Sequence, residues 1–317
     1  MDQKRIIDEF KELVSIEVHS RDERAIADVL KEKLTALGLT VTEDKAGEVL
    51  GGNTGNLYAQ LPGSTDGEPV LFSAHMDRVG NHGHIVPLVK EEEGKIVSDG
   101  TSILAGDDIG GVAAILAMLR EVKEKQIPHG LIEVAFSVCE ETGVEGSRQY
   151  DFSKFRSKSA FVYDASGKAG TIVLAAPSKG RVTIRVHGVT AHAGNEPEKG
   201  LNALKVAADL IMQLPDGRLS PVSTANFSII EAGSATNVVC DFVTITGEQR
   251  SRDAKEYQQI SADIQAAADR ISEKYHTKIE VELHTLYHAF KLEENARPCV
   301  LAKEAAEAVC AVQIGRA

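Results

Sequence analysis

The segment PVLFSAHMD at residues 69–77 shows the pattern that decides the fold, an apolar and strand-forming run that ends in polar side chains. The same pattern returns in LIEVAFSVCEE at 131–141 and in AFVYD at 160–164. Between these runs, GGVAAILAMLREV at 110–122 has the apolar spacing of a helix. This alternation predicts an α/β fold in which a sheet carries helices on both faces.

The polar groups after these runs form an ordered series. Its members are His75, Asp77, Asp107, Glu140, Glu141 and Asp164. Asp107 lies in the loop AGDDIGG at an expected helix start, and the other members follow strands, where α/β sheets gather their ligands. Divalent ions take imidazole and carboxylate ligands, and a bridged pair needs one carboxylate that reaches both ions. The series therefore predicts a two-metal hydrolase site.

The flanking sequence on the amino side predicts two amphipathic helices. The first covers residues 3–15, where Ile6, Phe10 and Leu13 lie at helical spacing. Ser20 and Glu23 have the spacing of a capping box that would start the second helix, and Gly38 is placed to end it.

On the carboxyl side the periodicity of the apolar residues changes at about residue 178. Strand, helix, strand, strand, helix and strand patterns follow in that order, at 181–188, 201–212, 224–233, 237–248, 253–271 and 278–284. This order predicts an α+β, ferredoxin-like domain over residues 178–285, inserted into a metal-binding domain formed by 1–177 and 286–317. A last helix is expected over residues 296–312, started by Pro298.

Size, charge and cysteine content exclude several classes of protein. The chain has 317 residues, of which 43% are hydrophobic, so it can bury two cores. A net charge of −12 disfavours nucleic acid and anionic membranes as partners. The four cysteines show no close spacing, and neither a secretory signal nor an apolar membrane span is found. We therefore expect a cytoplasmic protein with reduced cysteines.

Each candidate residue also has a purely structural interpretation. His75 can bind a metal through one nitrogen while Asp77 holds the other, or both can be polar groups at a strand end. Asp107 suits a metal bridge, whereas the neighbouring Asp108 can simply cap the following helix. Of the adjacent acids Glu140 and Glu141, one can bind a metal and the other can transfer a proton, unless both are solvated in a turn.

Three further candidates lie in the inserted domain. His192, in the Gly-rich turn GVTAHAG, can donate a hydrogen bond to a developing oxyanion or can be an ordinary surface histidine. Asn237 follows GSAT, and Arg250 ends a strand. These two can bind a substrate carboxylate together, with strand-end polarity as the alternative.

With the motifs SAHMD, SDGTSILAGDDIGG, CEETGVEG, VYDASG, GVTAHAG and GSATNVV, the chain resembles the aminoacylase and peptidase T superfamily of dinuclear zinc exopeptidases, and most closely its peptidase T-like branch. The resemblance spans residues 1 to about 310. It implies that His75 and Asp164 bind one zinc and Asp107 bridges to a second zinc. The second zinc would be held by Glu141.

The resemblance also assigns the remaining residues. Asp77 would orient His75, and Glu140 would be the general base. The inserted domain would be a lid that mediates homodimerisation, and its His192 would reach the partner subunit's site. Asn237 and Arg250 would grip the substrate.

Two positions depart from the family pattern. Ile109 stands where many relatives have lysine, which we expect to be a mild change. Relatives also continue past the helix near Pro298 to a histidine that completes the second zinc site, and the printed sequence ends at QIGRA without it. We therefore expect a second site that lacks this ligand, and an altered reading frame is one hypothesis for the tail.

The leading functional hypothesis is a zinc-dependent exopeptidase that hydrolyses short peptides from the amino end, as a tripeptide aminopeptidase does. An amidohydrolase acting on N-acyl amino acids is the second hypothesis, since the motifs do not separate the two. The third is a C-terminally incomplete, inactive chain that binds metal and dimerises.

Overall fold

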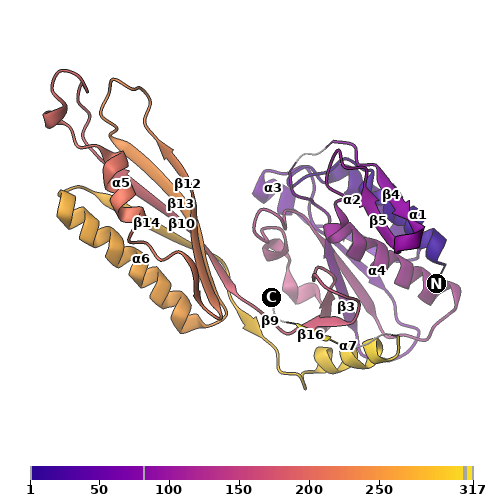
Figure 1. The fold of residues 1–317 in the computed structure, drawn as a ribbon. Helices are drawn as coiled ribbons and strands as arrows, with labels where there is room; N and C mark the ends of the chain where they lie inside the picture. The colour runs from indigo at the N-terminus through magenta and orange to yellow at the C-terminus, as the bar shows by residue number, and fades with distance from the viewer. Residues whose placement is uncertain (1, 81–82, 310–312, 316–317) are drawn as a thin grey trace. The chain divides into compact units, whose positions relative to one another are not determined.

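The computed structural model describes residues 2–80, 83–309 and 313–315. It divides into two compact units, each described by itself below (Figure 1). The first contains Met1–Ala169 and Val300–Ala305, and the second contains Gly170–Cys299 and Ala306–Ala317.

The first unit has the predicted α/β composition. In chain order its elements are α1 (Gln3–Val14), α2 (Arg24–Ala36), β1 (Thr40–Glu43), α3 (Ala46–Leu50), β2 (Leu57–Leu61), β3 (Val70–His75), β4 (Pro87–Lys90), β5 (Lys95–Ser98), α4 (Gly106–Glu124), β6 (Ile132–Ser137) and β7 (Ser159–Val162). Five strands form one sheet in the order β1-β2-β6-β3-β7, and β4 and β5 form a separate antiparallel hairpin. β3 runs parallel to both β6 and β7, so three strands end at the same edge.

The core of the first unit lies between this sheet and the helices α1, α2 and α4. Residues such as Leu13, Leu30, Leu116 and Phe136 are fully buried there. Every residue of β6 is buried, as expected for a central strand whose apolar run is nearly continuous. The apolar stripes predicted for α1, α2 and α4 are therefore confirmed.

The capping box predicted for Ser20 and Glu23 is wrong. Glu23 precedes α2 without a side-chain bond to the helix, and Asn53 Oδ1 instead accepts a hydrogen bond from Arg24 N at 3.1 Å. The Ser20 hydroxyl donates to Asp77 Oδ2 at 2.6 Å. Both side chains of the expected box are thus turned toward residues far away in the sequence.

The second unit contains the predicted β-α-β-β-α-β domain. Its elements are β8 (Thr171–Val173), β9 (Ala175–Ala176), β10 (Ser178–His187), α5 (Ala203–Ile211), β11 (Gly217–Ser220), β12 (Ser223–Ala232), β13 (Phe242–Ser251), α6 (Ala254–Tyr275), β14 (Ile279–Tyr287) and β15 (Phe290–Lys291). Five antiparallel strands form a sheet in the order β11-β12-β13-β10-β14. Every second residue of β10 is buried, and α5 and α6 share its core.

Two details of this unit differ from the sequence-based expectation. β11 is an additional edge strand, which its short segment did not predict. β13 begins at Phe242 rather than at residue 237, because residues 237–239 pair with the turn around His192 instead. The extent 178–285 of the inserted domain stays a prediction.

The last described segments are a helix and a short strand. α7 (Arg297–Glu307) matches the first part of the helix predicted at 296–312, and residues 310–312, including Cys310, lie outside the described residues. β16 (Gln313–Gly315) pairs in parallel with β8. Neither of these two short strands was predicted. In the part of the chain that the structure describes, no helix is long and apolar enough to cross a membrane.

Candidate metal centre

Three parallel strands bring the predicted site residues to one edge of the first unit's sheet. His75, the last residue of β3, lies opposite Ser137 at the end of β6. The turn with Glu140 and Glu141 follows β6, and Asp164 follows β7. The carboxyl ends of parallel strands meet at one edge, so strand order alone makes these side chains neighbours.

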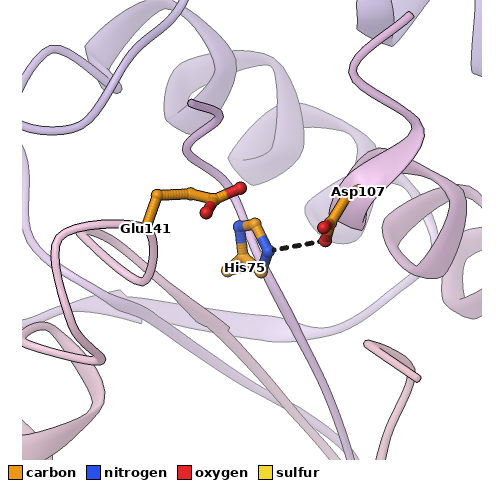
Figure 2. Close-up of side chains that lie close together, drawn as sticks. All are labelled: His75, Asp107 and Glu141. Carbon is orange, nitrogen blue, oxygen red and sulfur yellow. Dashed lines mark hydrogen bonds and ion pairs between the residues drawn. The ribbon is translucent and has the colours of Figure 1, made fainter. Parts of the chain in front are cut away.

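His75 is the centre of this group and is 2% exposed. Its Nε2 atom lies 3.2 Å from Asp107 Oδ1, 3.9 Å from Asp164 Oδ1 and 4.0 Å from Glu140 Oε2. Figure 2 shows Asp107 and Glu141 on opposite sides of the imidazole ring. One imidazole nitrogen therefore faces several carboxylates at once.

The other nitrogen of His75 is occupied by Asp77. Nδ1 lies 2.9 Å from the backbone oxygen of Asp77 and 3.4 Å from its Oδ1 atom. The backbone oxygen is the nearer acceptor, so it orients the ring directly, while the carboxylate also supports it. An Nδ1–H tautomer leaves the Nε2 lone pair available to a metal.

The start of α4 presents Asp107 to the ring. Asp107 and Asp108 have non-helical backbone angles, and the peptide bond between them is cis. Asp108 is buried, with Oδ2 accepting a hydrogen bond from His75 N and Oδ1 accepting one from Gly111 N, both at 3.2 Å. It therefore caps the helix and also fixes β3 at the point where His75 leaves it.

Gly111 allows this helix to lie against the chain that leads to Asp164. A Cβ atom at position 111 would come within 2.8 Å of both the Cβ and the backbone oxygen of Tyr163. Nothing lies within 4 Å of the corresponding position at Gly110. The close approach of two ligand-bearing segments thus depends on one of two adjacent glycines.

Three acids of the site, Asp108, Glu141 and Asp164, are held in an environment that disfavours their charge. Burial raises the pKa of Asp164 to about 7 and the pKa of Asp108 to about 8. Burial also raises the pKa of Glu141. For His75, burial acts to lower the pKa, but Asp77, Asp108 and Asp164 together raise it to about 10. The clustered negative charge calls for a cation, either protons or metal ions.

The donor atoms fit a divalent metal. Two groups, His75 with Asp107 and Glu141, and His75 with Glu140 and Asp164, each offer ligand atoms within 4.8 Å of one another. Imidazole nitrogen and carboxylate oxygen are the donors that zinc and related ions accept. This grouping sets Glu140 beside Asp164 and Asp107 beside Glu141, and the individual ligand roles stay predictions.

The three candidates of the inserted domain lie in the second unit. His192 is exposed, and its Nδ1 atom accepts hydrogen bonds from Gly194 N and Asn195 N, both at 3.2 Å. The backbone oxygen of Asn237 accepts from Ala193 N at 2.9 Å. The turns that carry His192 and Asn237 are therefore held together, with the His192 ring fixed by its own turn.

Arg250 belongs to a charged cluster on the same sheet. Its Nε atom lies 2.7 Å from Glu248 Oε1, and Lys179 Nζ, from the strand position opposite, lies 3.5 Å from Glu248 Oε2. Glu248 raises the pKa of Arg250. Within the described chain, the Nη atoms of Arg250 have no hydrogen-bond partner. The Glu248 carboxylate thus orients the guanidinium through Nε and leaves the two Nη atoms available to a ligand.

Sequence reasoning missed the contribution of Glu23 to this site. Glu23 is fully buried, and its Oε1 atom accepts a hydrogen bond from Cys139 N at 3.0 Å. A signal was present, because Glu23 lies at helical spacing from the buried residues Ile26, Ala27 and Leu30. A carboxylate on the apolar face of a helix indicates a buried partner elsewhere.

Comparisons with known proteins agree with this arrangement. The family model described as "Peptidase family M28" matches residues 56–195, and the one described as "Peptidase dimerisation domain" matches residues 177–276. A Bacillus subtilis protein, "Uncharacterized protein YqjE", is 36% identical over 306 residues, which cover 96% of this chain and 82% of that protein. Fold and site together define a metallopeptidase.

Two solved structures define the family more closely. The aminopeptidase PepT from Bacillus cereus matches with a TM-score of 0.88 and 37% identity, over 100% of this chain and 85% of that chain. A tripeptidase from Staphylococcus aureus matches with a TM-score of 0.94 and 32% identity, over the same shares. The chain belongs to the peptidase T-like family of metallopeptidases.

Proposed function

We propose that this metallopeptidase releases residues from the amino end of short peptides, with tripeptides as the preferred class, in a site built for two zinc ions. The observation that carries the proposal is the convergence of carboxylates on His75 Nε2 at 3.2 to 4.0 Å. Relatives described as an aminopeptidase and a tripeptidase support the substrate class.

In this proposal each acid of the site has one role. His75 and Asp164 would hold one ion, Glu141 would hold the other, and Asp107 would contribute to both. Asp77 orients His75, an assignment supported by its contacts with Nδ1. Because burial raises the pKa values of Asp164 and Glu141, bound cations would let both carboxylates ionise.

The chain's own residues then move the proton. Bound zinc ions supply Lewis acidity, which polarises the scissile carbonyl and acidifies water. Glu140, the base in this scheme, accepts a proton from the attacking water and delivers it to the leaving amine. It is suited to this work because its side chain is 27% exposed and lies at the edge of the cluster.

The second unit would supply substrate contacts. Arg250, with the free end of its guanidinium, binds the substrate carboxylate together with Asn237, and His192 stabilises the oxyanion in the partner subunit of a homodimer. The matched peptidase dimerisation domain at 177–276 supports dimer formation through residues 178–285. We place the enzyme in the cytoplasm and expect no nucleic acid or membrane partner.

A substrate panel tests the proposal. The full chain, supplied with zinc, is assayed on tripeptides, on the same tripeptides with an acetylated amino end, and on N-acyl amino acids. We expect hydrolysis of the free tripeptides only, because an enzyme that releases residues from the amino end requires that end to be free. Hydrolysis of N-acyl amino acids in their place, or a chain that binds no zinc, overturns the proposal.

A further inference from the structure

The turn that carries Glu140 and Glu141 is held by its backbone N–H groups. Cys139 N donates to Glu23 Oε1 at 3.0 Å. Glu140 N and Glu141 N donate to Asp77 Oδ1 and Oδ2, at 2.9 and 3.1 Å. Three consecutive amides are therefore each bound by a carboxylate that is fully buried.

This turn needs such support because of its backbone conformation. Cys139 has a φ of 51°, in the left-handed region that non-glycine residues adopt at a cost. The carbonyls of Cys139 and Glu140 are satisfied inside the turn, by Glu145 N at 3.0 Å and by Val144 N at 2.7 Å. The amides of residues 139–141 have no such internal partner and depend on Glu23 and Asp77.

The environment of Glu23 points to the same task. Burial raises its pKa, and its Oε2 atom has no hydrogen-bond partner among the described residues. All of its hydrogen bonds use Oε1, which also accepts from Arg21 N at 3.0 Å and lies 3.5 Å from Cys139 Sγ. Burying a carboxyl group costs free energy unless its hydrogen bonds compensate. The hydrogen bonds of Oε1 therefore indicate the structural role of Glu23.

We propose that Glu23 is a positioning residue of the metal centre, whose Oε1 atom holds the Cys139 amide and thereby sets the directions of the Glu140 and Glu141 side chains. The inference rests on the proposed roles of these two acids. Asp77 binds the next two amides and is already tied to His75, so it holds only the later part of the turn. Glu23 fixes the first amide, where the chain leaves β6.

Loss of the Glu23 acceptor should lower zinc affinity and kcat together. Without an acceptor for Cys139 N, the left-handed residue relaxes and both following side chains turn away together. Zinc affinity, which depends on Glu141, and kcat, which depends on Glu140, should therefore fall in parallel while KM changes little. Residues that orient metal ligands typically change affinity by about 10- to 100-fold.

Two substitutions separate the acceptor from the charge. Glu23→Gln keeps an oxygen at the same reach and removes the charge, whereas Glu23→Asp keeps the charge and withdraws the oxygen by one methylene. We expect Glu23→Gln to bind zinc within about threefold of wild type and Glu23→Asp to bind about 10- to 100-fold more weakly. Chelator competition measures zinc affinity, and tripeptide hydrolysis gives kcat and KM.

Hydrogen exchange provides a readout that needs no metal. In the metal-free protein, the amides of residues 139–141 should exchange faster in Glu23→Asp than in wild type, and Glu23→Gln should match wild type. The matched control is Glu9, a buried carboxyl group on α1 whose Oε1 atom lies 2.6 Å from Arg120 Nη2. Glu9→Gln and Glu9→Asp should leave zinc affinity and these three amides unchanged.

The outcomes are distinguishable from those of the proposed function. If Glu23→Gln loses zinc affinity tenfold or more, or if Glu23→Asp binds zinc and exchanges as wild type does, the positioning role is overturned. Where Glu23→Asp folds poorly, Glu23→Met replaces it, because methionine keeps the length of the side chain and has no oxygen acceptor; wild-type zinc affinity and exchange in Glu23→Met would also overturn the positioning role. If Glu141→Ala keeps full zinc affinity, the proposed ligand set fails instead, and the exchange rates still report on Glu23.

Discussion

Around His75 in the first unit, carboxylates outnumber cationic groups, whereas around Glu248 in the second unit two cations share one carboxylate. In the first cluster, burial raises the pKa of Asp164 to about 7. In the second, burial acts to raise the pKa of Glu248, but Arg250 and Lys179 hold it below its usual range. In the first cluster the carboxylates therefore exceed the cationic groups, and in the second the cationic groups exceed the carboxylate.

The difference shows how one chain can prepare two kinds of ligand contact with the same residue types. A group of acids whose members oppose one another's ionisation is ready for a divalent cation. A guanidinium oriented by one carboxylate, with its end free, is ready for an anion. The first four of the following predictions each test one side of this comparison, and the last concerns an acid outside both clusters.

The largest effect is expected for Glu140→Gln. If Glu140 is the base, kcat for a tripeptide should fall by about 10²- to 10⁴-fold, because the proton has no acceptor. Zinc content should stay unchanged, since Glu141 and not Glu140 is the proposed ligand. The matched control is Glu145→Gln in the same turn, where the carboxylate contacts Arg21 and Thr142, and kcat should there stay within tenfold. A Glu140→Gln enzyme with full kcat contradicts the assigned base.

Metal removal should affect the two units differently. With zinc about 1,000-fold above its Kd, binding stabilises the folded state by about 4 kcal/mol, and a chelator should remove this from the first unit. Amide hydrogen exchange reports the stability of each unit separately, through β3 and β6 in the first unit and through β10 and β13 in the second. We expect faster exchange in the first pair of strands only. Equal changes in both would show that the acid cluster does not hold the metal.

On the cationic side, Arg250→Ala should weaken substrate binding. Loss of a charge-assisted pair of about 1.5 to 3 kcal/mol raises KM for tripeptides by about 10- to 100-fold, with kcat nearly unchanged. The effect should disappear for tripeptide amides, which carry no terminal carboxylate. Arg185→Ala, which removes an exposed partner of Glu282 on the same sheet, serves as the control. An equal KM increase for amides and acids would exclude carboxylate recognition.

The adjacent glycines of α4 test how closely the acid cluster must be packed. Gly111→Ala should lower zinc affinity about tenfold, because its Cβ atom would lie 2.3 Å from Asp108 Oδ1 and 2.8 Å from both the Cβ and the backbone oxygen of Tyr163. Accommodating it costs about 1 to 3 kcal/mol. Gly110→Ala meets no atom within 4 Å and should stabilise the helix by up to about 1 kcal/mol. Titration of both variants with zinc, together with thermal unfolding, measures the contrast. Equal zinc affinities would show that this close approach is not required.

The smallest effect concerns an acid of the first unit that lies away from the metal site. The Arg24 guanidinium holds the pKa of Glu43 below its usual range. Its contribution to stability is therefore present above an unfolded pKa of about 4.3 and is lost as the pH falls through the folded value. Glu43→Gln should lower the free energy of unfolding by about 1 kcal/mol at pH 7, and the difference should close below about pH 4. A difference that grows with acidity would contradict this sign.

Much of the fold could be predicted from the sequence, because its determinants are local. Apolar runs ending in His75, Glu140 and Asp164 indicate strands, and parallel pairing then places their ends together. The β-α-β-β-α-β order of the second unit was equally evident from periodicity. The edge strand β11 was not, since four residues carry too little alternation to be recognised.

The roles of Ser20 and Glu23 could not be predicted from spacing, because a capping box and a long-range contact use the same side chains. Whether Glu23 binds its own helix or the Cys139 amide is decided by tertiary structure. The same holds for Asp108, which was expected only to cap α4 and also binds His75 N. Local patterns identify which groups can bond, and packing selects their partners.

The left-handed residue of the metal-ligand turn also carries a thiol. Cys139 is fully buried, and burial raises its pKa to about 12, so a thiol reagent can modify it only when the turn opens. Cys240, which is partly exposed, offers a faster-reacting reference in the same chain. The labelling rate of Cys139 thus reports how often this turn opens, and it can be measured without substrate or metal.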